Sequence, residues 1–99
     1  MRLTPSQIRA IKAAVADVIG LDSRVWLFGS RVDDALRGGD IDLLIETDEA
    51  VPNRIKCLCK LEAALVWGLG DRKIYILLKD SRTPDAGIYS IARNTGVLL

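Results

Sequence analysis

Segments with helical periodicity alternate with short segments of strand formers along this chain of 99 residues. Apolar spacing and turn residues predict, in order, helix 5–19, strand 24–28, a short helix within 31–37, strand 40–46, helix 53–67, strand 73–79 and helix 85–94. Such alternation predicts an α/β fold, a single domain over residues 1–99 in which helices cover a small sheet. The link between the first two strands is compatible with either a crossover or a hairpin-like return.

Helix boundaries are marked by particular residues. Thr4, Pro5 and Gln7 form the pattern of an N-cap, a first-turn proline and a side chain that reaches back to the cap. We expect the glycines that follow the apolar spacing to end the helices, namely Gly20, Gly68 with Gly70, and Gly96.

Composition excludes several classes of function. The chain has 14 basic and 13 acidic residues, which is too even for a protein held mainly by nucleic-acid phosphates. It has no histidine, which removes Ser-His-Asp and Cys-His nucleophilic machinery. No apolar run approaches the ~18 residues of a membrane span, and the first residues lack a secretion signal. We therefore expect a cytoplasmic protein without membrane association whose chemistry uses carboxylates, Lys, Arg, Tyr or Cys.

The cysteines and tryptophans have mainly structural interpretations. Cys57 and Cys59 lie in the helix expected over 53–67, where they point about 200° apart and cannot share a metal. We expect both to be buried or half-buried on that helix. Trp26 and Trp67 are expected in the core, and the alternative is that one of them belongs to a partner-facing apolar patch.

The stretch with chemical content joins a glycine-serine turn to a pair of aspartates. Gly29-Ser30 follows a strand and precedes the expected short helix, where backbone N–H groups favour phosphate oxygens. Asp40 and Asp42 alternate with apolar residues, so both carboxylates project from one strand face, ~6.6 Å apart along the chain. This combination suits a nucleoside triphosphate carried by Mg²⁺, with Arg31 available for a phosphate.

At these residues the chain resembles the minimal nucleotidyltransferase (MNT) family of the DNA polymerase β-like superfamily. The family pattern is a hydrophobic residue and Gly-Ser, a spacer of about ten residues, then two aspartates that alternate with hydrophobic residues. It is met by Phe28-Gly29-Ser30 and Asp40-Ile41-Asp42-Leu43, and Arg31 extends it. The resemblance covers nearly the whole chain and implies a mixed sheet of three or more strands flanked by helices. It also implies Mg²⁺- or Mn²⁺-dependent nucleotidyl transfer with release of pyrophosphate.

One position departs from the family pattern. Members usually carry a third carboxylate on a later strand, in a segment that corresponds here to Lys73-Ile74-Tyr75-Ile76. Tyr75 takes the acid position, and a phenol, neutral at pH 7, is a poor metal ligand and a poor base. Asp71, Glu46 and Asp80 do not replace it, on strand spacing or parity. Nucleotide binding is therefore better supported than turnover.

Two functions from different classes remain open. The first is an enzyme that binds a nucleoside triphosphate, with ATP expected, and transfers a nucleotidyl group to a hydroxyl of a macromolecular acceptor. The second is a catalytically weak or inactive, antitoxin-like protein that acts by binding a partner. The resemblance implies a helical HEPN-domain partner in a toxin–antitoxin module for either function, and homo-oligomers are also compatible with it.

Overall fold

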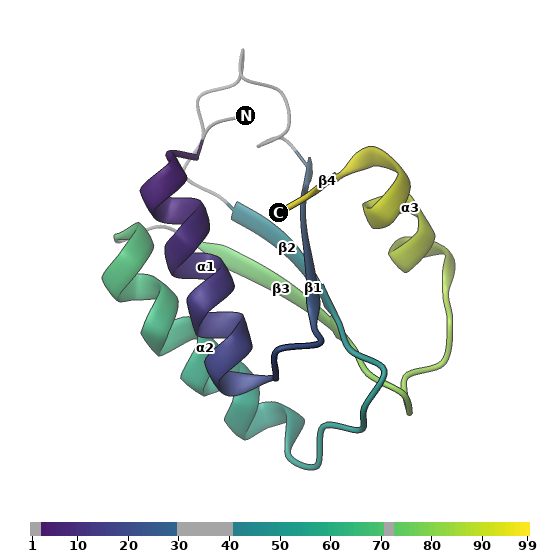
Figure 1. Ribbon diagram of the computed structural model, residues 1–99. Coiled ribbons are helices and arrows are strands. Elements are labelled where there is room, and N and C mark those ends of the chain that lie inside the picture. The colour runs from purple at the N-terminus through teal and green to yellow at the C-terminus, as the bar shows by residue number, and fades with distance from the viewer. Residues whose placement is uncertain (1–2, 30–40, 71–72) are drawn as a thin grey trace.

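The computed structural model describes residues 3–29, 41–70 and 73–99 (Figure 1). Its elements are α1 (Pro5–Val18), β1 (Arg24–Phe28), β2 (Ile41–Glu46), α2 (Arg54–Leu69), β3 (Ile74–Lys79), α3 (Gly87–Thr95) and β4 (Val97–Leu98). The short helix expected within 31–37 lies outside the described residues. All the other expected helices and strands are present, and β4 is an additional strand that the sequence did not indicate.

The four strands form one mixed sheet with the order β3-β2-β1-β4. β1 and β2 are antiparallel, so the hairpin-like return is the correct alternative for the link between them. β2 and β3 are parallel, and α2 crosses between them (Figure 1). β4 pairs antiparallel with β1 at the other edge. The expectation of a small mixed sheet flanked by helices is confirmed.

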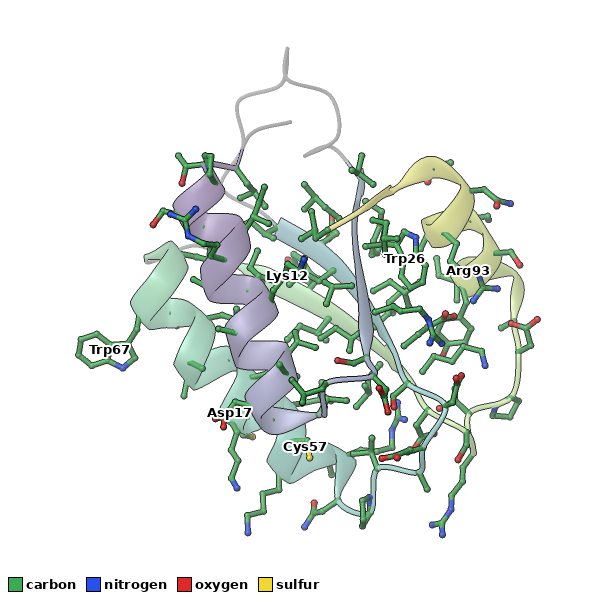
Figure 2. All side chains as sticks on the ribbon, in the orientation of Figure 1. Lys12, Asp17, Trp26, Cys57, Trp67 and Arg93 are labelled. Carbon is green, nitrogen blue, oxygen red and sulfur yellow. The ribbon has the colours of Figure 1, made fainter. Side chains whose placement is uncertain are left out.

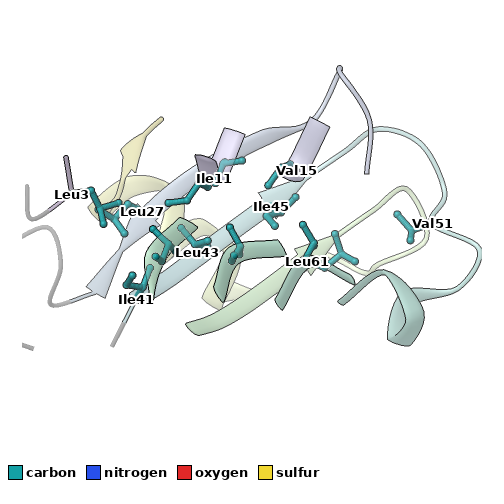
Figure 3. Packing of buried hydrophobic residues seen from close by; sticks show 13 residues of the cluster. Leu3, Ile11, Val15, Leu27, Ile41, Leu43, Ile45, Val51 and Leu61 are labelled. Carbon is teal, nitrogen blue, oxygen red and sulfur yellow. The ribbon is translucent and has the colours of Figure 1, made fainter. Parts of the chain in front are cut away.

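The main core lies between one face of the sheet and the helices α1 and α2 (Figure 3). Alternation in β2 points Ile41, Leu43 and Ile45 into this layer, where all three are fully buried. The other buried members of the cluster are Leu3, Ile11, Val15, Val25, Leu27, Val51, Leu61, Leu65, Leu69 and Leu78. The remaining residues of β2 therefore lie on the face of the sheet opposite to this core.

The opposite face of the sheet is covered in part by α3 (Figure 1). Leu44 of β2 and Ala92 of α3 are fully buried, which shows that this face also excludes water where α3 covers it. The Arg93 guanidinium on α3 donates a hydrogen bond to Glu46, and Arg24 of β1 lies 3.7 Å from the same carboxylate. This ion-pair group ties α3 to the end of β2 that is remote from Asp42.

Local signals predicted most of the helix boundaries. The Thr4 hydroxyl accepts a hydrogen bond from the Gln7 N–H and the Gln7 side chain accepts one from the Thr4 N–H, so the expected capping box is present. The prediction that Gly68 ends α2 is wrong, because the helix continues to Leu69. A Cβ on Gly68 would lie 2.7 Å from the Ala10 Cβ, so this glycine instead allows close approach of α1.

Two expectations about burial on α2 are corrected. Trp67 is 93% exposed and points away from the body of the molecule, whereas Trp26 is half-buried (Figure 2). Cys57 is half-buried as expected, but Cys59 is exposed; both are free thiols. No helix in the described part of the chain is long and apolar enough to cross a membrane.

Candidate functional site

The candidate site lies at one end of the central strands. Because β1 runs antiparallel to β2 and β3, its carboxyl end meets the amino ends of both of those strands. Gly29 directly follows β1, Asp42 is the second residue of β2, and Tyr75 is the second residue of β3. The other residues that the sequence assigned to the site, namely Ser30, Arg31 and Asp40, lie outside the described residues.

Asp42 is the middle member of a row that crosses three strands. It is in register with Phe28 on β1 and with Tyr75 on β3. Residues in register on neighbouring strands project from the same face, with the strands about 4.8 Å apart. This face is opposite to the main core, because Ile41 and Leu43 on either side of Asp42 are buried in it. The pairing therefore places the Tyr75 phenol beside the half-buried Asp42 carboxylate.

Gly29 brings the backbone directly against that carboxylate. Its φ is +75°, in the left-handed region that side chains rarely adopt. A Cβ at this position would overlap Asp42 Oδ2 and would lie 3.2 Å from Asp42 Cγ. Glycine is therefore required here for two reasons, the backbone conformation and the space next to Oδ2. The exposed Gly29 backbone therefore lies next to the Asp42 carboxylate.

Two of the three acids considered as a third carboxylate are engaged elsewhere, and the other, Asp71, lies outside the described residues. Glu46 is paired with Arg93 and Arg24 at the far end of β2. Asp80, only 2% exposed, follows the far end of β3 and accepts hydrogen bonds from the Val51 N–H and the Thr83 hydroxyl, both at 2.8 Å. These two hydrogen bonds lower the pKa of Asp80 to about 2. Both acids therefore stabilise the fold at the opposite end of the sheet.

At the same far end of the sheet, the pKa of one arginine is also shifted. A hydrogen bond with the Asp48 carboxylate raises the pKa of Arg24 above its ordinary value. Arg54, the first residue of α2, donates to the Leu78 carbonyl oxygen at 2.6 Å and to the Thr83 hydroxyl at 3.0 Å. These contacts fix the loop at the end of β3, and sequence reasoning missed them. The pattern of Asp80 and Thr83 in a turn is the signal that could have indicated them.

Tyr75 lines a depression that sequence reasoning did not predict. The depression has a volume of about 270 Å³ and is lined by Glu62 and Val66 of α2 and by Lys73, Ile74 and Tyr75 at the start of β3. The four-residue spacing of Glu62 and Val66 places them on one helix face, which was the available signal. Lys73, two residues before Tyr75, lines the same depression. The depression brings a cation, a carboxylate and apolar surface next to Tyr75 at the β3 edge of the sheet.

The described residues supply a partial metal site. Within residues 3–29, 41–70 and 73–99, no three Asp, Glu, Cys or His side chains come together around a common point. Asp42 is the one predicted metal ligand in these ranges, and its carboxylate is the type of donor that Mg²⁺ prefers. Proteins often bind Mg²⁺ through one or two carboxylates, with phosphate oxygens and waters completing the coordination. The donor chemistry of Asp42 therefore fits such an ion.

Comparison with known proteins shows a family for the chain. A family model described as a nucleotidyltransferase domain matches residues 8–93. The match extends from α1 through α3 and so includes every strand residue in the row of Phe28, Asp42 and Tyr75. No curated protein matches the chain.

Proposed function

Because the chain belongs to the nucleotidyltransferase domain family, we propose that it binds a Mg²⁺-carried nucleoside triphosphate at Gly29 and Asp42 and transfers the nucleotidyl group. ATP is the expected nucleotide, and a hydroxyl of a macromolecule is the expected acceptor. In this proposal Ser30 and Arg31 complete the phosphate contacts, and Asp40 joins Asp42 as the second metal ligand.

The observation that carries the proposal is the contact between the Gly29 backbone and Asp42. Gly29 itself is exposed and has a positive φ directly after β1, and backbone N–H groups in such turns can bind phosphate oxygens. A carboxylate directly beside such a turn would repel phosphate unless a cation lies between them. The adjacency of these two groups therefore favours a phosphate–metal pair over either ligand alone.

A divalent cation has a specific place in this mechanism. Asp42 and, from the sequence pattern, Asp40 would hold Mg²⁺ or Mn²⁺, which neutralises phosphate charge when bound. The chain's own groups orient the substrate: the Gly29 backbone contacts phosphate oxygens, and Lys73 supplies a positive charge at the start of β3. The acceptor hydroxyl would then approach from the open side, near Tyr75, which is 51% exposed.

A catalytically weak, antitoxin-like protein is the second candidate. The observation that supports it is the register of Tyr75 with Asp42, because the resemblance implies a third carboxylate at the position of this phenol. A phenol does not replace a carboxylate as a metal ligand or base at neutral pH. Replacing Tyr75 with Asp should raise transfer strongly if this candidate is correct. Equal activity of the native chain and Tyr75→Asp would count against it.

The proposed partner is a helical protein of the HEPN type, and α2 supplies support for a protein-binding surface. Ile55, Val66 and Trp67 on this helix are all more than half exposed. Large exposed aromatic residues often anchor protein interfaces. A partner that docks on the carboxyl-terminal half of α2 would contact Val66, which also lines the depression beside Tyr75. An acceptor hydroxyl on that partner could thus reach the site.

A transfer assay tests the proposal. The chain is incubated with each α-labelled nucleoside triphosphate and Mg²⁺ or Mn²⁺, with and without the protein encoded by the neighbouring gene. We expect metal-dependent label on an acceptor, and its loss in Asp42→Asn. Asp17→Asn, which removes an exposed carboxylate on α1, is the matched control and should retain transfer. Transfer that persists in Asp42→Asn would show that the site is wrongly assigned.

A further inference from the structure

The candidate site contains an oxygen nucleophile of its own, in register with the metal-binding carboxylate. Tyr75 pairs with Asp42 across adjacent parallel strands, and both side chains project from the face opposite to the main core. The chain has two tyrosines, and the other, Tyr89, lies on α3. The phenol at position 75 is therefore placed where a nucleotide held by Asp42 would present its phosphates.

The Tyr75 hydroxyl is also accessible. The side chain is 51% exposed, and no hydrogen bond among the described residues uses its hydroxyl. Other hydroxyls are engaged within the fold: that of Thr83 donates to Asp80, and that of Thr95 donates to the Ile91 carbonyl oxygen. A hydroxyl that is open to solvent and lies beside the site can react without breaking a structural contact.

The surroundings of Tyr75 provide room and charge for a phosphate. The depression of about 270 Å³ places Lys73 beside Tyr75, and Glu62 lies on its α2 side. Lys73 and Tyr75 are two residues apart at the start of β3, so an extended chain directs both to one face. The lysine ammonium can attract a phosphoryl group toward the phenol.

From this juxtaposition we infer that Tyr75 is a self-modification site, at which the chain nucleotidylates its own phenol. The inference rests on the proposed function, because it uses the nucleoside triphosphate held at Gly29 and Asp42. The Tyr75 oxygen bonds to the α-phosphorus, the bond from that phosphorus to the bridging oxygen of the β-phosphate breaks, and pyrophosphate leaves. The phenolic proton passes to solvent. The product is a phosphodiester between Tyr75 and the nucleoside. Each chain carries one such nucleotidyl group, because Tyr75 has one hydroxyl.

The full chain, incubated with α-labelled nucleoside triphosphates and Mg²⁺ and then denatured, tests this inference. We expect the wild type and Tyr89→Phe to carry covalent label and Tyr75→Phe to lose it. Trypsin cleaves after Lys73 and Lys79, so residues 74–79 form a peptide whose only tyrosine is Tyr75. Mass spectrometry should find the added nucleoside monophosphate on that peptide. Calorimetric titration of each variant with Mg-ATP measures nucleotide binding separately.

The two measurements distinguish the possible failures. A wild type that binds Mg-ATP but takes no label would overturn self-modification and leave the proposed nucleotide site intact. Label that persists in Tyr75→Phe, or that maps outside residues 74–79, would also overturn it. A wild type that binds none of the nucleoside triphosphates would overturn the proposed function, and self-modification with it. Label on residues 74–79 with unchanged binding by Tyr75→Phe supports the inference.

Discussion

Replacement of Gly29 by alanine should test the contact between the β1 turn and Asp42, and Gly70 offers a matched control. Both glycines have left-handed backbone, with φ of +75° and +81°. Alanine in this conformation costs about 1–2 kcal/mol at either position. A Cβ on Gly70 would meet nothing within 4 Å, whereas one on Gly29 would overlap Asp42 Oδ2. Both variants therefore carry a backbone cost for a positive φ, with ψ of −162° at Gly70, and Gly29→Ala alone adds the collision.

The collision should make Gly29→Ala the more destabilised variant. Forcing a side chain out of its place adds about 1–3 kcal/mol. We therefore expect a loss of about 2–5 kcal/mol in the free energy of unfolding for Gly29→Ala and about 1–2 kcal/mol for Gly70→Ala. In a chain of this size, each kcal/mol lowers Tm by about 4–8 °C. Denaturant unfolding followed by circular dichroism measures both losses.

A double-mutant cycle isolates the contact itself. Asp42→Ala removes both Oδ2 and Cγ, the atoms nearest to a Cβ on Gly29. In the Asp42→Ala background, Gly29→Ala should therefore cost no more than Gly70→Ala does in the wild type. The coupling energy between positions 29 and 42 is expected to be about 1–3 kcal/mol. A coupling energy near zero would refute the claim that the β1 turn abuts this carboxylate.

Three further predictions concern other parts of the molecule. Asp80→Ala should cost about 1–3 kcal/mol by leaving a buried N–H unbonded. Because the fold lowers the pKa of Asp80 from 3.8 to about 2, its stabilisation is present above pH 3.8 and should disappear as the pH falls to about 2. Gly68→Ala should lower Tm despite the better helix propensity of alanine, and adding Ala10→Gly should restore it. Trp67→Ala should change stability by less than about 0.5 kcal/mol but weaken partner binding in calorimetry by about 2 kcal/mol or more; Leu21→Ala, equally exposed, should not weaken it.

The elements that local sequence signals determine were predictable. The capping box at Thr4 and the alternation of Ile41, Leu43 and Ile45 depend on neighbours in the sequence, and both are present. β4 was missed because it has two residues and exists through its pairing with β1, about 70 positions earlier in the chain. A strand so short gives no periodicity to detect.

The errors on α2 have a tertiary cause. Gly68 resembles a helix end in the sequence, but α2 continues through it to Leu69. The glycine is explained by α1, which packs so closely that a Cβ would collide with Ala10. Trp67 was expected in the core because of its size, yet the sheet and α1 already cover the leucine face of α2. The tryptophan falls on the remaining face, where nothing within the described chain packs over it.

The site residues remain predictions from the sequence, whereas the arrangement of the described ones comes from the structure alone. Local spacing singled out Gly29 and Asp42 as candidates, and the family resemblance singled out Tyr75. The juxtaposition of Asp42 and Tyr75 required the parallel register of β2 and β3, which a helical crossover creates and no local pattern encodes. Glu62 and Val66 come from α2, and their place beside Tyr75 follows only from helix packing.

Nucleotide binding at Asp42 is the central claim, and calorimetric titration with ATP in the presence of Mg²⁺ tests it most directly. The wild type and the control Asp17→Asn should bind with the same affinity. Asp42→Asn should lose this binding, because the substitution removes the negative charge that holds the cation between carboxylate and phosphates. Asp42→Asn that binds Mg-ATP as tightly as the wild type would contradict the account.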